Sequence, residues 1–183
     1  MKRWFILSAI GQDRPGLVAE LAQLVYDADA NLEDSRMTIL GSDFAVILLA
    51  SSAQTGTGDR LLLGAKRLER DHGLTILVRA LDGQPRGPVP APGHVAMRVR
   101  AAGADKAGIV AGVCRVLAAH DVNIADLSTR SRPGEGGSPH YEMAMTVEVP
   151  DRLDVETLRK ALEAEADRLV VDVRIEPLQV GLR

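Results

Sequence analysis

The chain contains one short sequence twice, and this repeat constrains its fold more than any other feature. Residues 11–19 read GQDRPGLVA and residues 103–111 read GADKAGIVA, so that Gly, Asp and Gly recur 92 positions apart. The same separation carries the Asn-Leu-Glu-Asp of residues 31–34 onto the Asn-Ile-Ala-Asp of residues 123–126. A repeat at this period indicates two copies of one folding unit.

Composition divides the chain in the same way. We predict a first domain at residues 1–82, a linker at residues 83–93 and a second domain at residues 94–183, because residues 82–93 contain four prolines and three glycines. Each copy then has the size of a small domain, which gains stability by pairing with another. Apolar residues make up 46% of the chain and aromatic residues only 3%, so we expect aliphatic cores.

Hydrophobic periodicity predicts the order strand-helix-strand-strand-helix-strand in each copy. Leucines at helical spacing give the first helix an apolar face, and Asp13 is expected to cap it by accepting a hydrogen bond from the Gly16 amide. Leu153 and Leu158 are placed to form a hydrophobic staple at the start of the last helix. The predicted elements are strands 4–10, 32–40, 44–50 and 74–81 with helices 17–28 and 61–71, and then strands 94–100, 122–131, 141–149 and 169–175 with helices 109–117 and 154–166.

The repeated loop suggests a binding site for an anionic group. We expect Gly16 and Gly108 in the first turn of a helix, where amide groups lack internal partners and the helix dipole favours negative charge. A glycine, which has no Cβ atom, lets a ligand approach that backbone closely, and the ligand group that we expect there is a carboxylate. The alternative is that Asp13 and Asp105 are only helix caps and the glycines only packing residues.

The two asparagines and the second hairpin are each open to two interpretations. Asn31 and Asn123 either satisfy their own backbone in a left-handed turn or present an amide to a ligand brought by another domain. The hairpin loop at residues 132–140 is five residues longer than its counterpart and can reach over residues 103–108. Arg130 and Arg132 beside it either clamp a carboxylate or end a solvated hairpin.

Charge and motif content argue against several classes of protein. Residues 1–91 carry ten Lys/Arg against eleven Asp/Glu and residues 92–183 carry twelve against fourteen, so neither half has the basic excess of a nucleic-acid-binding domain. The single cysteine, Cys114, suits a reducing cytoplasm, and no apolar run approaches membrane-spanning length. The histidines show no metal-ligand spacing, and no phosphate loop or nucleophile elbow occurs. We therefore expect no metal, no cofactor and no catalysis.

The repeated motif resembles a known family. Residues 11–18, followed by the Asn-x-x-Asp of residues 31–34 and then by Phe44, resemble the opening of an ACT domain. The second copy is similar, with Lys106 in place of the arginine and Ala107 in place of the proline. Together the copies resemble tandem stand-alone ACT proteins of the glycine cleavage system transcriptional repressor family. The resemblance implies an α+β fold of two ferredoxin-like βαββαβ domains, each an antiparallel four-stranded sheet with two helices on one face.

The resemblance also implies a function. Members of that family pair ACT domains side by side, bind amino acids between them, lack a DNA-binding module and act by contacting a transcriptional activator. We therefore expect a cytoplasmic, non-catalytic regulatory protein, forming a homodimer, that binds a small amino acid such as glycine or serine. The two alternative functions are a ligand-free protein-interaction module and a small enzyme with residues 132–140 as a lid. The residues that the resemblance implies for ligand binding are Gly11, Gln12, Asp13, Gly16 and Leu17 with Asn123, and Gly103, Asp105, Gly108 and Ile109 with Asn31.

Overall fold

A computed structural model describes residues 1–87, 90–133 and 139–178 of the chain. The chain divides into two compact units, Met1–Gly87 and Pro88–Arg183. Each unit has its own hydrophobic core, as the repeat requires. No helix in the described part of the chain is long and apolar enough to cross a membrane.

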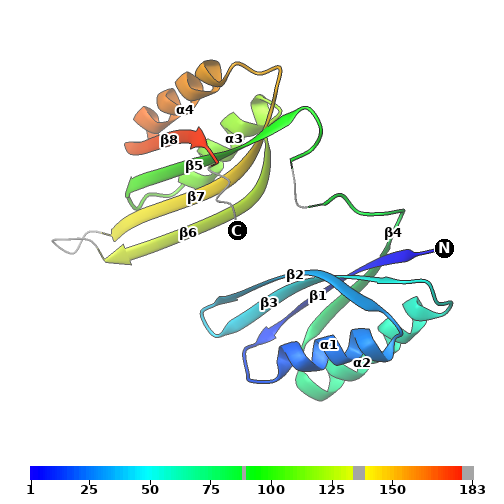
Figure 1. The fold of residues 1–183 in the computed structure, drawn as a ribbon. Coiled ribbons are helices and arrows are strands. Elements are labelled where there is room, and N and C mark those ends of the chain that lie inside the picture. The colour runs from blue at the N-terminus through cyan, green and yellow to red at the C-terminus, as the bar shows by residue number, and fades with distance from the viewer. Residues whose placement is uncertain (88–89, 134–138, 179–183) are drawn as a thin grey trace. The chain divides into compact units, whose positions relative to one another are not determined.

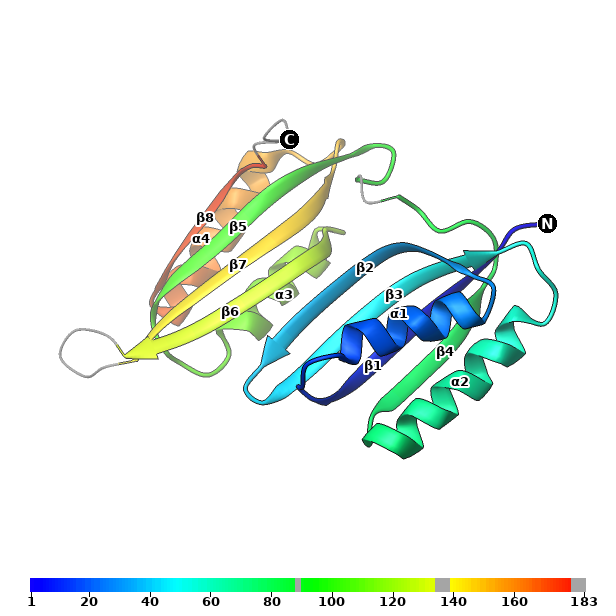
Figure 2. The same ribbon diagram turned by 60° about the horizontal axis from the view of Figure 1, so that its bottom comes forward.

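The first domain is a four-stranded antiparallel sheet of order β2-β3-β1-β4, with both helices on one face (Figure 1). Figure 2 shows α1 and α2 side by side on that face. The central strands β1 and β3 alternate between buried and more exposed residues, which is the pattern of a sheet covered on one side. Its elements are β1 (Arg3–Gln12), α1 (Leu17–Asp27), β2 (Asn31–Leu40), β3 (Asp43–Ser52), α2 (Thr57–His72) and β4 (Thr75–Leu81).

The second domain repeats this topology with the order β6-β7-β5-β8, again antiparallel throughout. Its two helices likewise cover a single face of the sheet (Figure 1). The predicted fold class is therefore confirmed in both copies. The elements are β5 (His94–Ala104), α3 (Ile109–Ala119), β6 (Asn123–Pro133), β7 (Pro139–Pro150), α4 (Val155–Leu169) and β8 (Val171–Pro177).

The predicted order of elements is confirmed, and the main differences lie at their ends. Strand β5 runs to Ala104, beyond the predicted end at residue 100, because it stays paired with β8 as far as Gly103 and with β7 as far as Ala104. Helix α2 begins at Thr57, four residues earlier than predicted. The Thr57 hydroxyl is buried and donates to the side chain of Ser52 five residues earlier, a polar contact that hydrophobic periodicity does not reveal.

The outer edge strand and the sheet face without helices leave much of each sheet open. Every residue of β2 is exposed, and all but one residue of β6 is exposed. On the first domain's open face, Ile10, Ile47 and Leu77 are 56%, 53% and 63% exposed. Exposed apolar side chains on one open sheet face are typical of a protein-interaction site.

Helix α4 begins with a side-chain cap. Asp154 is its N-cap and accepts hydrogen bonds from the amides of Glu156 and Thr157 at 3.3 and 3.1 Å. Leu153 packs against the second core, and Leu158 is fully buried, as the predicted hydrophobic staple requires. The Thr157 hydroxyl, which donates to the Asp154 carboxylate, and then the Glu156 amide lower the pKa of Asp154.

Replacing Asp154 by alanine is expected to lower the Tm of the second domain at neutral pH, because two helix amides lose their acceptor. A carboxyl with a lowered folded-state pKa stabilises the fold above its unfolded-state pKa, and that stabilisation disappears as the pH falls through the folded-state value. The melting curves of D154A and the unmodified protein should therefore converge in acid. Asp13→Ala is the control, since Asp13 does not cap a helix. A pH-independent difference would contradict this role of the carboxylate.

Candidate functional site

A glycine in the left-handed conformation starts the first helix of each domain. Gly16 is the N-cap of α1 with φ 96°, and Gly108 is the N-cap of α3 with φ 98°. Among the residues that the structure describes, no side chain accepts a hydrogen bond at either cap. The first-turn amides therefore have no intrahelical or side-chain acceptor, and they lie at the positive end of the helix dipole.

The prediction that Asp13 caps α1 was wrong, because Gly16 itself occupies the N-cap position, and Asp105 likewise does not cap α3. These aspartates fasten the loop to the neighbouring hairpin. The Asp13 amide donates to the Ser42 carbonyl oxygen at 2.9 Å, and the Asp105 amide donates to the Pro139 carbonyl oxygen at 3.0 Å. The Asp105 carboxylate also accepts from the Ser131 hydroxyl at 2.6 Å. These three hydrogen bonds hold the two loops in place and do not involve the first-turn amides of the helices.

The remaining predicted loop residues are two close-packed glycines, two buried apolar residues and one exposed glutamine. A Cβ atom at Gly11 would lie 2.6 Å from Leu74 Cδ2, so this glycine lets β1 pass close to the start of β4. Gly103 has the same role, since its Cβ atom would lie 3.0 Å from Val171 Cγ1. The side chains of Leu17 and Ile109 are buried in the cores, at 2% and 1% exposure, so only their backbone amides can meet a ligand; Gln12 is the exposed last residue of β1.

Charge near the two loops differs between the domains. Arg14 Nη2 lies 2.7 Å from Glu20 Oε2, and His72 Nε2 lies 3.2 Å from the same oxygen. The hydrogen bond from Arg14 lowers the pKa of Glu20, which stands in the first turn of α1. The second copy has Gly112 at this position and no acidic residue in the first turn of α3. The first turn of α3 therefore has no acidic residue of its own, and the space beside Gly112 is taken by Glu165 of α4, whose Oε1 would lie 2.2 Å from a Cβ atom at Gly112.

Asn31 and Asn123 lie far from the loop of their own domain. Asn31 pairs with Ser51 at one end of β3, whereas Gly11 pairs with Phe44 at the other end. The corresponding Asn123 donates to Glu148 Oε2 at 2.9 Å across the strands. A site that combines the loop with an asparagine therefore needs two domains.

The expected left-handed turn lies two residues before each asparagine. Asp29 and Asp121 adopt the positive φ values of 55° and 60°, while Asn31 and Asn123 are the first residues of strands β2 and β6. Aspartate tolerates this conformation nearly as well as asparagine, so sequence alone misplaced the turn. The asparagine side chains are consequently not used to satisfy such a turn.

The long second hairpin lies at the predicted end of the sheet. The bond between Asp105 and Pro139 joins its base to the strand-to-helix loop. Whether the tip reaches over residues 103–108 depends on residues 134–138, which lie outside the described residues.

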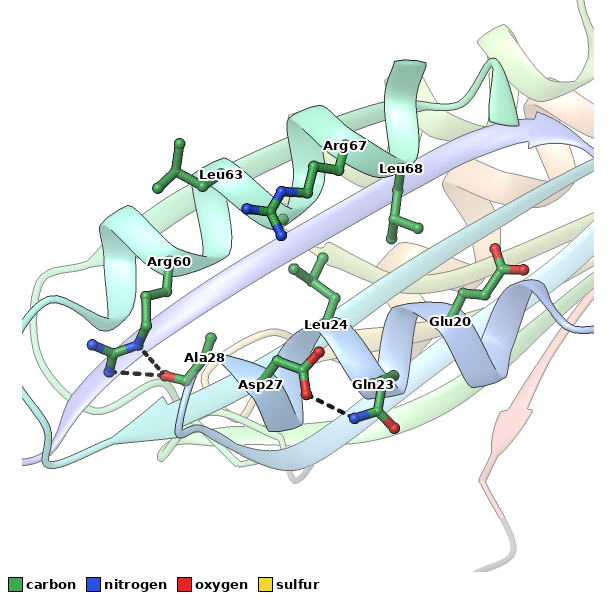
Figure 3. Close-up of a pocket in the computed structure, with 10 residues that line it drawn as sticks. Glu20, Gln23, Leu24, Asp27, Ala28, Arg60, Leu63, Arg67 and Leu68 are labelled. Atoms are coloured by element: carbon green, nitrogen blue, oxygen red, sulfur yellow. Dashed lines mark hydrogen bonds between the residues drawn. The ribbon is translucent and has the colours of Figure 1, made fainter. Parts of the chain in front are cut away.

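A groove of about 430 Å³ between α1 and α2 was not predicted (Figure 3). Gly64 lines the groove and makes room for the Leu24 side chain, because a Cβ atom there would lie 2.1 Å from Leu24 Cδ1. Leu24, Leu63 and Leu68 supply its apolar surface, and Asp27 on the rim accepts a hydrogen bond from Gln23 (Figure 3). None of the predicted ligand-binding residues lines this groove. A glycine inside a helical pattern was the available signal for it.

The residues needed for metal binding or thiol chemistry do not come together. Among the residues that the structure describes, no group of three or more His, Cys, Asp or Glu side chains can hold a metal ion. Burial raises the pKa of Cys114, which disfavours the reactive thiolate.

The fold, the repeated loop and the pair of helices in each unit together define a protein of two tandem ACT domains. The ACT domain family matches residues 3–79 and, in a second match, residues 98–167. The glycine cleavage system transcriptional repressor of Escherichia coli is 30% identical over 165 residues, covering 89% of this chain and 84% of the relative. The chain belongs to the glycine cleavage system transcriptional repressor family.

Other relatives agree with this architecture. A crystal structure of a protein of unknown function from Galdieria sulphuraria superimposes with a TM-score of 0.82 at 29% identity, covering 97% of this chain and 99% of that one. A UPF0237 protein from Pyrobaculum aerophilum is 39% identical over 79 residues, covering 43% of this chain and 82% of the relative. That relative has about the length of one copy of the repeat.

Proposed function

We propose that the protein is a non-catalytic regulator that binds a small amino acid, such as glycine or serine, and alters its contact with a protein partner. The observation that carries this proposal is the left-handed glycine before the open helix amides, present once in each domain. The ligand carboxylate accepts hydrogen bonds from these amides, where the helix dipole adds to the attraction. Membership of a family that contains a transcriptional repressor supports a regulatory role.

Each proposed site is made by two domains. The loop at residues 11–17 combines with Asn123, and the loop at residues 103–109 combines with Asn31. Within a single domain the loop and the asparagine lie at opposite ends of the sheet, which supports a site built between domains. An asparagine side-chain oxygen then accepts from the ligand ammonium group. We propose that the chain forms a homodimer and that residues 83–93 link its domains.

The partner is proposed to be a protein, such as a transcriptional activator. The proposed location of both is the cytoplasm. The two halves of the chain are nearly balanced in charge, which argues against a direct role in nucleic-acid binding. Amino acid binding regulates the partner only if the free protein and the partner-bound protein bind the amino acid with different affinity. Partner binding must then change the affinity for the amino acid by the same factor.

Calorimetry with a panel of amino acids tests this proposal. Glycine or serine is expected to bind, and glycinamide is expected not to bind, because it keeps the ammonium group and lacks the carboxylate. Equal binding of glycine and glycinamide would contradict a carboxylate site at the helix amides. Failure of every amino acid to bind folded protein would favour the second candidate, a ligand-free interaction module, which the packing of Gly11 and Gly103 also supports.

A further inference from the structure

The open face of the second sheet carries a group of arginines around a hollow. Arg100 on β5 and Arg130 and Arg132 on β6 line this hollow, whose volume is about 400 Å³. Glu142 on β7 is the acidic residue of its lining. Three cations against one anion give this part of the surface a positive charge, although the whole chain carries a net charge of −3.

Small residues make the hollow possible. Arg130 is opposite Glu142, which is opposite Ala102, so these three residues form one row across the sheet. In the next row on the same face, Ala144 lies opposite Arg100. The alanine side chains cover little of the strands, and the longer arginine side chains stand around them.

Within the described residues, the fold does not use the charges of Arg130 and Arg132 on β6. Among the described residues, neither Arg130 nor Arg132 has a carboxylate within 4.0 Å, and Arg100 Nη1 lies 3.5 Å from Glu176 Oε1 at the surface. Such an exposed pair contributes little to stability. Arginines that are not committed to internal ion pairs remain available to a partner.

The first domain provides an internal comparison. At the positions of Arg100, Arg130 and Arg132 it has Ser8, Thr38 and Leu40, 92 residues earlier. The two alanines on the open face, Ala102 and Ala144, correspond to the larger residues Ile10 and Ile47. The same sheet therefore forms without the three arginines, and the second domain carries cationic side chains where the first has uncharged ones.

We propose that this arginine-lined hollow is the docking site for an acidic segment of the protein partner. The inference rests on the proposed function, in which the protein acts through such a partner. Arginine forms bidentate hydrogen bonds with carboxylates and is enriched at protein interfaces. A small anion is a poorer fit, because small-molecule sites enclose most of the ligand surface and this hollow lies on an open sheet face. Residues 92–183 carry twelve Lys/Arg against fourteen Asp/Glu and so lack the basic excess that a nucleic-acid backbone requires.

Binding of a fluorescently labelled oligoglutamate peptide to the full-length protein tests the site by fluorescence anisotropy. The double variant R130Q/R132Q is expected to weaken binding about ten-fold. Glu142→Gln should instead strengthen it, because this change removes the negative charge from the lining. Arg36→Gln is the matched control, since Arg36 lies on the open face of the first sheet, paired with Ile47.

Three results would overturn the docking site: no binding by the unmodified protein, equal losses in R130Q/R132Q and R36Q, or no gain in E142Q. Displacement of the peptide by inorganic phosphate at an equal molar concentration would identify a small-anion site instead. Duplex DNA that binds through the same arginines would identify a nucleic-acid surface instead.

Calorimetry with glycine and serine on the same variants separates this inference from the proposed function. R130Q/R132Q should keep the amino acid binding of the unmodified protein, because neither arginine belongs to the strand-to-helix loops. Amino acid binding without peptide binding would refute only the docking site. Peptide binding without amino acid binding would refute only the ligand-sensing role.

Discussion

Replacing Gly16 by valine is expected to remove amino acid binding at one of the two proposed sites while the first domain stays folded. Gly16 has φ 96°, and a β-branched residue in this region costs about 1–3 kcal/mol. The chain relieves this strain by moving the start of α1, which displaces the amides that receive the ligand carboxylate. Calorimetry should report half the binding stoichiometry, and Gly108→Val should remove the other half.

Gly56→Val separates ligand binding from general strain. Gly56 is the N-cap of α2 with φ 74° and, like Gly16, has no side-chain cap. The two variants should therefore lose similar stability, whereas binding at the Gly16 loop should be lost in G16V and kept in G56V. If G16V and G108V both bind amino acids normally, the glycines serve only the backbone, and the ligand-free module becomes the better account.

Much of the fold could be predicted because the repeat and the periodicity are local signals. Leucines at helical spacing and alternating apolar strand residues each indicate one element, and the second copy repeats the evidence. The hairpin and linker were marked by glycine and proline, which act on the backbone through their own geometry. The Asp154 helix start could also be located, because Leu153 and Leu158 flank it.

The site was harder to predict because its residues act through long-range contacts. The sequence does not distinguish Asp13 as a cap from Gly16 as a cap, since both are common at helix starts. The packing role of Gly11 depends on Leu74, which is distant in sequence. The arginine-lined hollow likewise requires the register of three strands, which brings Arg100 and Arg130 to the same face. No pattern in a single segment contains that information.

The second large effect is expected in the core of the first domain. Phe44 is 1% exposed and lies on the face of β3 that the helices cover. Phe44→Ala should lower the free energy of unfolding of this domain by about 3–5 kcal/mol, because it removes buried apolar surface and leaves a cavity. Trp4, the single tryptophan of the chain, lies in β1 of the same domain, so its fluorescence during urea unfolding reports on this domain.

Ile47→Ala is the matched control on the same strand. It also tests whether the open sheet face is exposed to solvent in the folded protein. Ile47 is 53% exposed on the face away from the helices, so its replacement should change the free energy of unfolding by only about 0.5 kcal/mol. A loss in I47A as large as that in F44A would mean that this apolar face is covered in the folded protein. Repeating the I47A measurement at several protein concentrations would then show what covers this face. If the face lies in a dimer interface, the loss in free energy of unfolding depends on protein concentration, whereas for a contact within one chain it does not.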